Sequence, residues 1–199
     1  MIDFEKINKL YTLGKQLTLS DVQVLFKSAK TKSYASGEHL IVEGETKRNV
    51  FLIRKGLVRA YKINEKGDEI TTLIRWENKI VASPNIILFN EPSQLYFETL
   101  EPTEVFYIDY DVLQTIISSN PKLESNRKFI LQNVLKETLQ RIDSFILLTP
   151  EERYLDFRKQ YPDIVNRVPN KFIANILGIT PVSLSRIRKR IVTKKDKFY

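Results

Sequence analysis

The side chains with the clearest chemical potential in this sequence are basic, and they crowd the end of the chain. Acidic and basic residues nearly balance over residues 1–120, so the formal net charge of +8 arises in residues 121–199. The last basic residues are Arg186, Arg188, Lys189, Arg190, Lys194, Lys195 and Lys197. A cationic excess confined to one segment is typical of a surface that binds a polyanion. A solvated basic tail would give the same pattern, so charge alone leaves both interpretations open.

The stretch that begins at Asn170 has the residue spacing of a helix-turn-helix motif. Counting Asn170 as the first position, Ala174 is the fifth residue, Gly178 the ninth and Leu184 the fifteenth. A small residue lets two helices cross closely, a glycine permits a left-handed turn, and an aliphatic residue locks the second helix onto the first. An ordinary helical hairpin would satisfy only one or two of these constraints. The spacing therefore predicts a DNA-binding motif.

The second helix of this motif is predicted to enter the major groove, where each base pair displays a distinct pattern. Thr180 and Pro181 are expected to start it, as its cap and its first residue. Arg186 is the candidate for direct readout, because arginine can bond bidentately to guanine. The other predicted DNA-contacting residues are shorter readers or phosphate binders: Lys171, Thr180, Val182, Ser183, Ser185, Lys189 and Arg190.

Few residues are available for catalysis or for metal binding. The sequence has no cysteine and a single histidine, His39. These 199 residues therefore lack the ligands for disulfides, thiol catalysis and cysteine-bound zinc or iron–sulfur sites. No phosphate loop, glycine-rich dinucleotide turn or nucleophile–base pair stands out, so we predict that the protein is not an enzyme and has no metal site.

The sequence also favours a protein that works away from membranes. No apolar run approaches the roughly 18 residues of a membrane span, and the first residues lack the apolar core of a signal peptide. We therefore expect no membrane partner and a cytoplasmic location.

The elements that must position the basic segment divide into a β part and an α part. Turn signals at Gly37, Gly44, Gly56 and Gly67 separate short β-rich runs, which indicates an antiparallel sandwich or barrel. Strands are expected at 39–42, 50–53, 57–63, 69–76, 95–100 and 104–109. Helical periodicity is expected ahead of them, from Asp3 to Lys30, and Asp111 is expected to cap a helix over 112–118.

A long helix is predicted from Lys122 to about Leu147, where the sequence has neither glycine nor proline. Its apolar residues repeat at intervals of four and three, which is the seam of a coiled coil. The seam is Leu131, Leu135, Thr138, Ile142 and Phe145. We interpret this element as a dimerisation helix, and a helix that packs only within its own chain is the alternative. Thr149 and Pro150 are expected to begin the next helix.

The order of these parts resembles the Crp/Fnr superfamily of bacterial transcription regulators. The resemblance covers nearly the whole chain and is carried by 36–45, 51–58, 66–69, Ala174, Gly178 and 179–186. It implies an α+β fold with a jelly-roll-like antiparallel β-roll of the cyclic-nucleotide-binding type over 1–120. A long dimerisation helix over 121–148 and an all-α helix-turn-helix domain over 149–199 would follow. It also implies a homodimer that binds double-stranded DNA and works with RNA polymerase.

The sequence departs from the family at the residues that would hold a cyclic nucleotide. Members that bind one carry a Gly-Glu pair and, further along, an arginine that faces the cyclic phosphate. In our alignment Ala82 and Ser83 replace the pair, and Ser93 replaces the arginine, with Gln94 beside it. No lysine or arginine lies between Val81 and Tyr96. We therefore expect no cyclic AMP cofactor, and these four residues mark a candidate pocket for an unknown effector or for none.

Two other functions stay open at this point. The protein could be a cyclic-nucleotide-responsive regulator, or a cyclic-nucleotide-binding-like module without a DNA role. The second would need a phosphate-binding segment that this sequence lacks.

Overall fold

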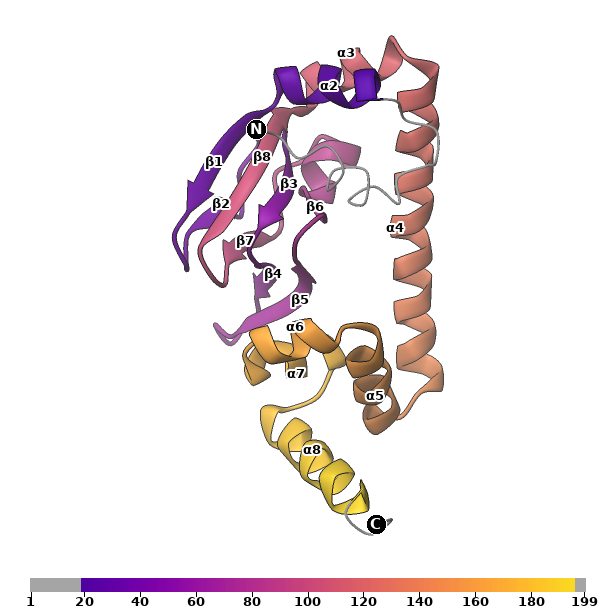
Figure 1. Cartoon of the computed structure of the whole chain (residues 1–199). Helices are drawn as coiled ribbons and strands as arrows, with labels where there is room; N and C mark the ends of the chain where they lie inside the picture. The colour runs from indigo at the N-terminus through magenta and orange to yellow at the C-terminus, as the bar shows by residue number, and fades with distance from the viewer. Residues whose placement is uncertain (1–18, 196–199) are drawn as a thin grey trace. The chain divides into compact units, whose positions relative to one another are not determined.

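The computed structural model describes residues 19–195, and the side chains of residues 23–193. Its internal contacts divide the chain into two units, which Figure 1 draws along one continuous ribbon. The first unit is Met1–Ala60 with Ile74–Thr138, and the second is Tyr61–Leu73 with Leu139–Tyr199. The domains 1–120, 121–148 and 149–199 rest on sequence patterns, whereas these units rest on contacts. The three domains therefore remain predictions.

The β part forms two four-stranded sheets, in the orders β1-β8-β3-β6 and β2-β7-β4-β5. The strands are β1 Lys30–Tyr34, β2 His39–Ile41, β3 Asn49–Lys55, β4 Val58–Ile63, β5 Glu69–Arg75, β6 Ile80–Val81, β7 Tyr96–Thr99 and β8 Thr103–Asp109. Strand β8 pairs antiparallel with both β1 and β3, which sets Tyr107 opposite Phe51. This confirms the predicted antiparallel fold, in which alternate strand residues such as Phe51, Ile53 and Val105 are buried.

Three elements in and before the sheets differ from the expectation, and one of them is β6, a strand at 80–81 where none was expected. Only α2, Leu19–Ser28, is described of the helix expected over 3–30, and residues 3–18 lie outside the described part of the chain. The expected end at Lys30 was wrong, because this residue begins β1 and pairs with Tyr107 of β8. The sequence of strand β1 has no alternating apolar pattern that would predict a strand. Four of its five residues are exposed, so they need not be apolar.

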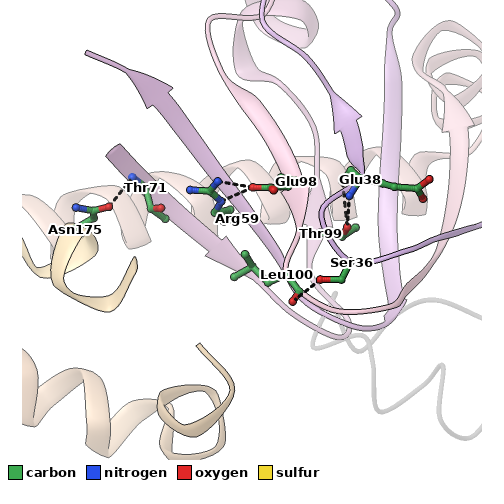
Figure 2. Close-up of polar contacts among 8 residues, drawn as sticks. All are labelled: Ser36, Glu38, Arg59, Thr71, Glu98, Thr99, Leu100 and Asn175. Atoms are coloured by element: carbon green, nitrogen blue, oxygen red, sulfur yellow. Dashed lines mark hydrogen bonds and ion pairs between the residues drawn. The ribbon is translucent and has the colours of Figure 1, made fainter. Parts of the chain in front are cut away.

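A buried ion pair lies within the second sheet. Arg59 of β4 is 3% exposed and contacts Glu98 of β7, with Nη2 2.5 Å and Nε 2.6 Å from the same carboxylate oxygen (Figure 2). A charge at this depth needs such a partner, because an unpaired buried guanidinium would lose its hydration without compensation.

Two helices follow the sheets, and the second is the long one. Helix α3 spans Tyr110–Ser118, and Asp109 caps it by accepting hydrogen bonds from the backbone N–H groups of Asp111 and Val112. The prediction that Asp111 is the cap was wrong, because the helix starts earlier and places Asp111 in its first turn. Helix α4 spans Pro121–Leu147, which confirms the long helix, and its 27 residues make it about 40 Å long.

The C-terminal part is entirely helical in its described residues. It contains α5 Pro150–Gln160, α6 Pro162–Arg167, α7 Asn170–Leu177 and α8 Pro181–Lys195 (Figure 1). Thr149 caps α5 through a capping box, as its hydroxyl accepts from the Glu152 N–H while the Glu152 carboxylate accepts from Thr149. Among the helices described, none combines the length and apolarity that crossing a membrane would require.

Candidate nucleic-acid interface

The turn between α7 and α8 has the geometry that the sequence predicts. Gly178 adopts φ +66°, in the left-handed region that favours glycine, and its N–H bonds back to Asn175 O at 3.0 Å. The N–H of Ile179 donates to Ala174 O at 3.0 Å. These bonds satisfy carbonyls that the end of α7 would otherwise leave unpaired.

A small apolar core joins the two helices of the motif. Ile173 and Ala174 of α7 and Leu184 of α8 are all 0% exposed. Ile187 and Ile191 continue the buried side of α8. The predicted helix-turn-helix packing is therefore confirmed, and it fixes which face of α8 is turned away from α7.

The N-terminus of α8 is closed by the predicted cap. The backbone N–H of Ser183 donates to Thr180 Oγ1 at 3.1 Å, and the two hydroxyl oxygens lie 2.9 Å apart. Thr180 is exposed and Ser183 is half-buried. Both residues were predicted to contact DNA, and here they bond to each other at the end of the helix that would enter the groove.

The structure gathers most of the other predicted DNA-contacting residues on the outward face of α8. Val182 is 60% exposed, and Ser185, Arg186, Lys189 and Arg190 are exposed as well. The exposed side chain of Lys171 comes from α7 instead.

One cation of this face already has a partner within the chain. Arg190 Nη1 lies 2.8 Å from the Glu151 carboxylate of α5. Glu151 would therefore compete with a phosphate for this guanidinium.

Sequence reasoning missed the contacts that fasten the motif to α5 and that fasten α5 to Leu148, the residue after α4. Arg188 lies over the ring of Tyr154, with 5.4 Å from Cζ to the ring centroid, and it is half-buried. Arg153 of α5 donates from Nε to Leu177 O at 3.1 Å and from Nη1 to Leu148 O at 2.7 Å. Both residues look like ordinary surface cations in the sequence, because no pattern reveals the aromatic ring that Arg188 contacts or the backbone carbonyls that Arg153 bonds.

The capping box of α5 also changes an ionisation equilibrium. Hydrogen bonds from the hydroxyl and the backbone N–H of Thr149 lower the pKa of Glu152 from its ordinary value of 4.5. The negative charge that results lies in the first turn of α5, where the helix dipole favours it.

The four residues of the candidate effector pocket have different environments. Ser83 and Ser93 are 1% and 2% exposed, Ala82 is half-buried, and Gln94 is exposed. Ser93 Oγ donates to Leu95 O at 2.8 Å, whereas Ser83 Oγ is buried without a hydrogen-bond partner among the described residues. The backbone of Ser93 also pairs with the 44–45 loop. The exposed Gln94 therefore does not share the buried environment of the two serines.

The single histidine lies at an edge of the sheet system. His39 is exposed on β2, and its ring centroid is 5.8 Å from that of Tyr96. Partial desolvation and the hydrogen-bonded carboxylate of Glu43 raise the pKa of the Tyr96 hydroxyl. Among the residues that the structure describes, no group of three or more His, Asp or Glu side chains could hold a metal ion.

Comparisons with known proteins agree with this architecture. The profile of the cyclic nucleotide-binding domain matches residues 31–120. The chain is 25% identical over 185 residues to the fumarate and nitrate reduction regulatory protein of Vibrio cholerae, a match that covers 85% of this chain and 73% of that protein. It is 21% identical over 196 residues to the global nitrogen regulator of Synechococcus elongatus, which covers 90% and 84%.

The fold is similar to the solved structure of FixK2 from Bradyrhizobium japonicum, with a TM-score of 0.73 at 19% identity. That likeness covers 84% of this chain and 86% of the other. In this chain residues 31–120 match the cyclic nucleotide-binding domain, and a long helix and a helix-turn-helix follow them. The chain is therefore similar, in sequence and in fold, to transcription regulators of the Crp/Fnr type.

Proposed function

We propose that this protein is a homodimeric regulator that binds DNA at a specific sequence. The observation that carries the proposal is the division of α8 into two faces. Leu184, Ile187 and Ile191 are buried, so the helix presents Val182, Ser185 and Arg186 to solvent. A recognition helix needs one face locked to its own domain and the other open to base edges.

The outward face has the chemistry for both kinds of DNA contact. Arg186 would bond to guanine in the major groove, and Val182 suits the methyl group of thymine. Lys171 and Lys189 would neutralise phosphates, which positions the protein without specifying sequence. Arg190 would join them by exchanging the Glu151 carboxylate for a phosphate oxygen.

The apolar side of α4 supports the homodimer. Within the single chain Leu131, Leu135, Leu139 and Ile142 are each 42–59% exposed, and they lie on the seam or directly beside it. An exposed apolar row of this length on a soluble helix favours pairing with a second helix. The alternative, packing within its own chain, would require these side chains to be covered.

Dimerisation through α4 sets the expected form of the operator. Two symmetry-related copies of α8 would enter successive major grooves about 34 Å apart. The site should therefore be nearly palindromic. We further propose RNA polymerase as a partner and a cytoplasmic location, where both polymerase and DNA are found.

The sensor domain is proposed to respond to an effector other than cyclic AMP, or to none. The segment from Val81 to Tyr96 offers no cation for a phosphate, and the hydroxyl of Ser93 is already bonded to its own backbone neighbourhood. The match of residues 31–120 to the cyclic nucleotide-binding domain keeps a cyclic-nucleotide-responsive regulator as the second candidate. A saturable rise in melting temperature on adding cyclic AMP would favour that second candidate.

Selection from a random duplex library tests the proposal. The full chain is incubated with the library at a stated salt concentration, because phosphate contacts make affinity depend on salt. We expect enrichment of one sequence with two related half-sites. Enrichment of no sequence, with equal retention of duplex DNA and heparin, would overturn the proposal.

A further inference from the structure

Two consecutive residues of the hairpin of β4 and β5 contact helices of the second unit, one on α7 and one on α4. The backbone N–H of Thr71 donates to Asn175 Oδ1 of α7 at 3.2 Å (Figure 2). The carbonyl of the next residue, Thr72, accepts a hydrogen bond from Arg141 Nη1. All four residues belong to the second unit, which unites Tyr61–Leu73 with Leu139–Tyr199.

Arg141 also reaches α7 with its other terminal nitrogen. Its Nη2 donates to Ile176 O at 3.4 Å, and its Cζ lies 5.8 Å from the ring centroid of Phe145. Ile176 is in the last turn of α7, where carbonyls lack intrahelical partners and a cation is favoured. A planar guanidinium can reach two separate acceptors with two different nitrogens, whereas a lysine offers all its donors from one nitrogen.

We infer that Arg141 is a positioning residue for DNA recognition, because it ties the β5 backbone to the first helix of the reading motif. This inference rests on the proposed function. Asn175 and Ile176 are neighbours on α7. Asn175 bonds directly to the backbone of β5, and Ile176 is linked to β5 through Arg141. These contacts fix how α7 is turned.

The orientation of α7 determines that of α8. Ala174 and Leu184 are both fully buried in the core that α7 and α8 share, so the two helices move as a pair. A turn of α7 would therefore carry Arg186 away from the base edge it reads. The expected consequence of losing Arg141 is a loss of sequence discrimination, with much less effect on binding to arbitrary DNA.

The test compares Arg141→Gln with the control Lys136→Gln in the full chain. Both variants remove one positive charge from α4, but the Lys136 side chain is exposed and makes no hydrogen bond or ion pair with the residues that the structure describes. Affinity is measured for the duplex selected by the wild type and for a scrambled duplex. We expect Arg141→Gln to lose about tenfold or more on the selected duplex, as for charged hydrogen bonds, and Lys136→Gln to lose far less. On the scrambled duplex the two variants should be alike.

Two further variants separate positioning from general stability. Arg141→Lys keeps the charge but offers one nitrogen, so its discrimination should lie between wild type and Arg141→Gln. Asn175→Ala removes the hydrogen bond between Thr71 and α7. Its effect on affinity combined with that of Arg141→Gln should be non-additive, because both residues fix the orientation of one helix. Equal affinity ratios for Arg141→Gln and Lys136→Gln, or purely additive losses, would overturn the inference.

These variants also distinguish misfolding, failure of the proposed function and failure of the positioning role. If Arg141→Gln unfolds, Arg141→Lys and Asn175→Ala still give the affinity ratio. If the wild type selects no duplex, the proposed function fails before any variant is compared. If the wild type selects a duplex and the variants discriminate like Lys136→Gln, only the positioning role of Arg141 fails.

Discussion

At the residue scale, Gly178 meets two demands that are independent of each other. Its φ of +66° disfavours any residue with a side chain, and a Cβ built there would lie 2.6 Å from Phe145 Cε1. Sequence spacing predicts the first demand, because a helix-turn-helix needs a glycine in its turn. The second could not be predicted, since nothing in the sequence reveals that a residue of α4 packs against this turn.

Replacing Gly178 by alanine tests both demands. A left-handed conformation costs about 1–2 kcal/mol for a non-glycine residue, and overpacking adds about 1–3 kcal/mol. The matched control is Gly67→Ala, where φ is +82° and nothing lies within 4 Å of the new Cβ. We expect urea unfolding to show a larger loss of unfolding free energy for Gly178→Ala. Equal losses in the two variants would contradict the close approach of Phe145.

At the element scale, α4 is the helix whose role depends most on a second copy of the chain. We predict that Leu135→Glu, which puts a carboxylate into the apolar seam, converts the dimer to a monomer. Sedimentation would show this, and affinity for a symmetric site would fall towards that for a half-site. Val112→Glu is the control, because Val112 is a similarly exposed valine on α3. A Leu135→Glu protein that stays dimeric would contradict the seam.

The start of α5 predicts a specific pH dependence. Folding lowers the pKa of Glu152 below 4.5, so the carboxylate stabilises the folded chain above that pH and loses this effect as pH falls through the folded pKa. The melting temperature of wild type should exceed that of Glu152→Gln by a constant margin near neutral pH. The margin should shrink below pH 4.5, and less so in a Thr149→Ala background. A margin that does not change with pH would contradict this assignment.

Elements with strong local signals were predicted and those fixed by distant partners were not. Proline, cap and apolar periodicity together predicted α4, α5 and α8 close to their actual starts. Strand β1 is polar and exists because β8 pairs with it. The short turn of π-helix at Asn85–Phe89 lies between residues 80–84 and 92–96, which correspond to the phosphate-binding positions of the family, and its sequence has no periodic pattern that predicts a helix.

At the scale of the whole molecule, the separation of charge leads to a salt prediction. Three cations per subunit, Lys171, Lys189 and Arg190, would neutralise about six phosphates in a dimer. Affinity should then fall about 10³-fold between 50 mM and 200 mM salt, the lower end for such interfaces. Lys189→Gln should reduce the slope of log affinity against log salt by about one per subunit. An affinity independent of salt would contradict the phosphate contacts.

The division into units is a property of the whole chain that the sequence did not disclose. Residues 61–73 were expected to belong with the β domain, as a hairpin between two of its strands. These residues do form strands of the second sheet, and their contacts also group them with Leu139–Tyr199, through Thr71, Thr72 and Arg141. The hairpin makes these bonds with backbone atoms, so the types of its side chains could not predict them.

The central claim is that α8 reads base edges, and the Arg186→Ala variant tests it most directly. Wild type and variant are titrated with the selected duplex, with copies carrying single base-pair changes, and with a random duplex. We predict that Arg186→Ala loses about 1–3 kcal/mol on the selected duplex and no longer discriminates at one base pair of each half-site. An equal loss on the selected and random duplexes, with discrimination intact at every position, would contradict the claim.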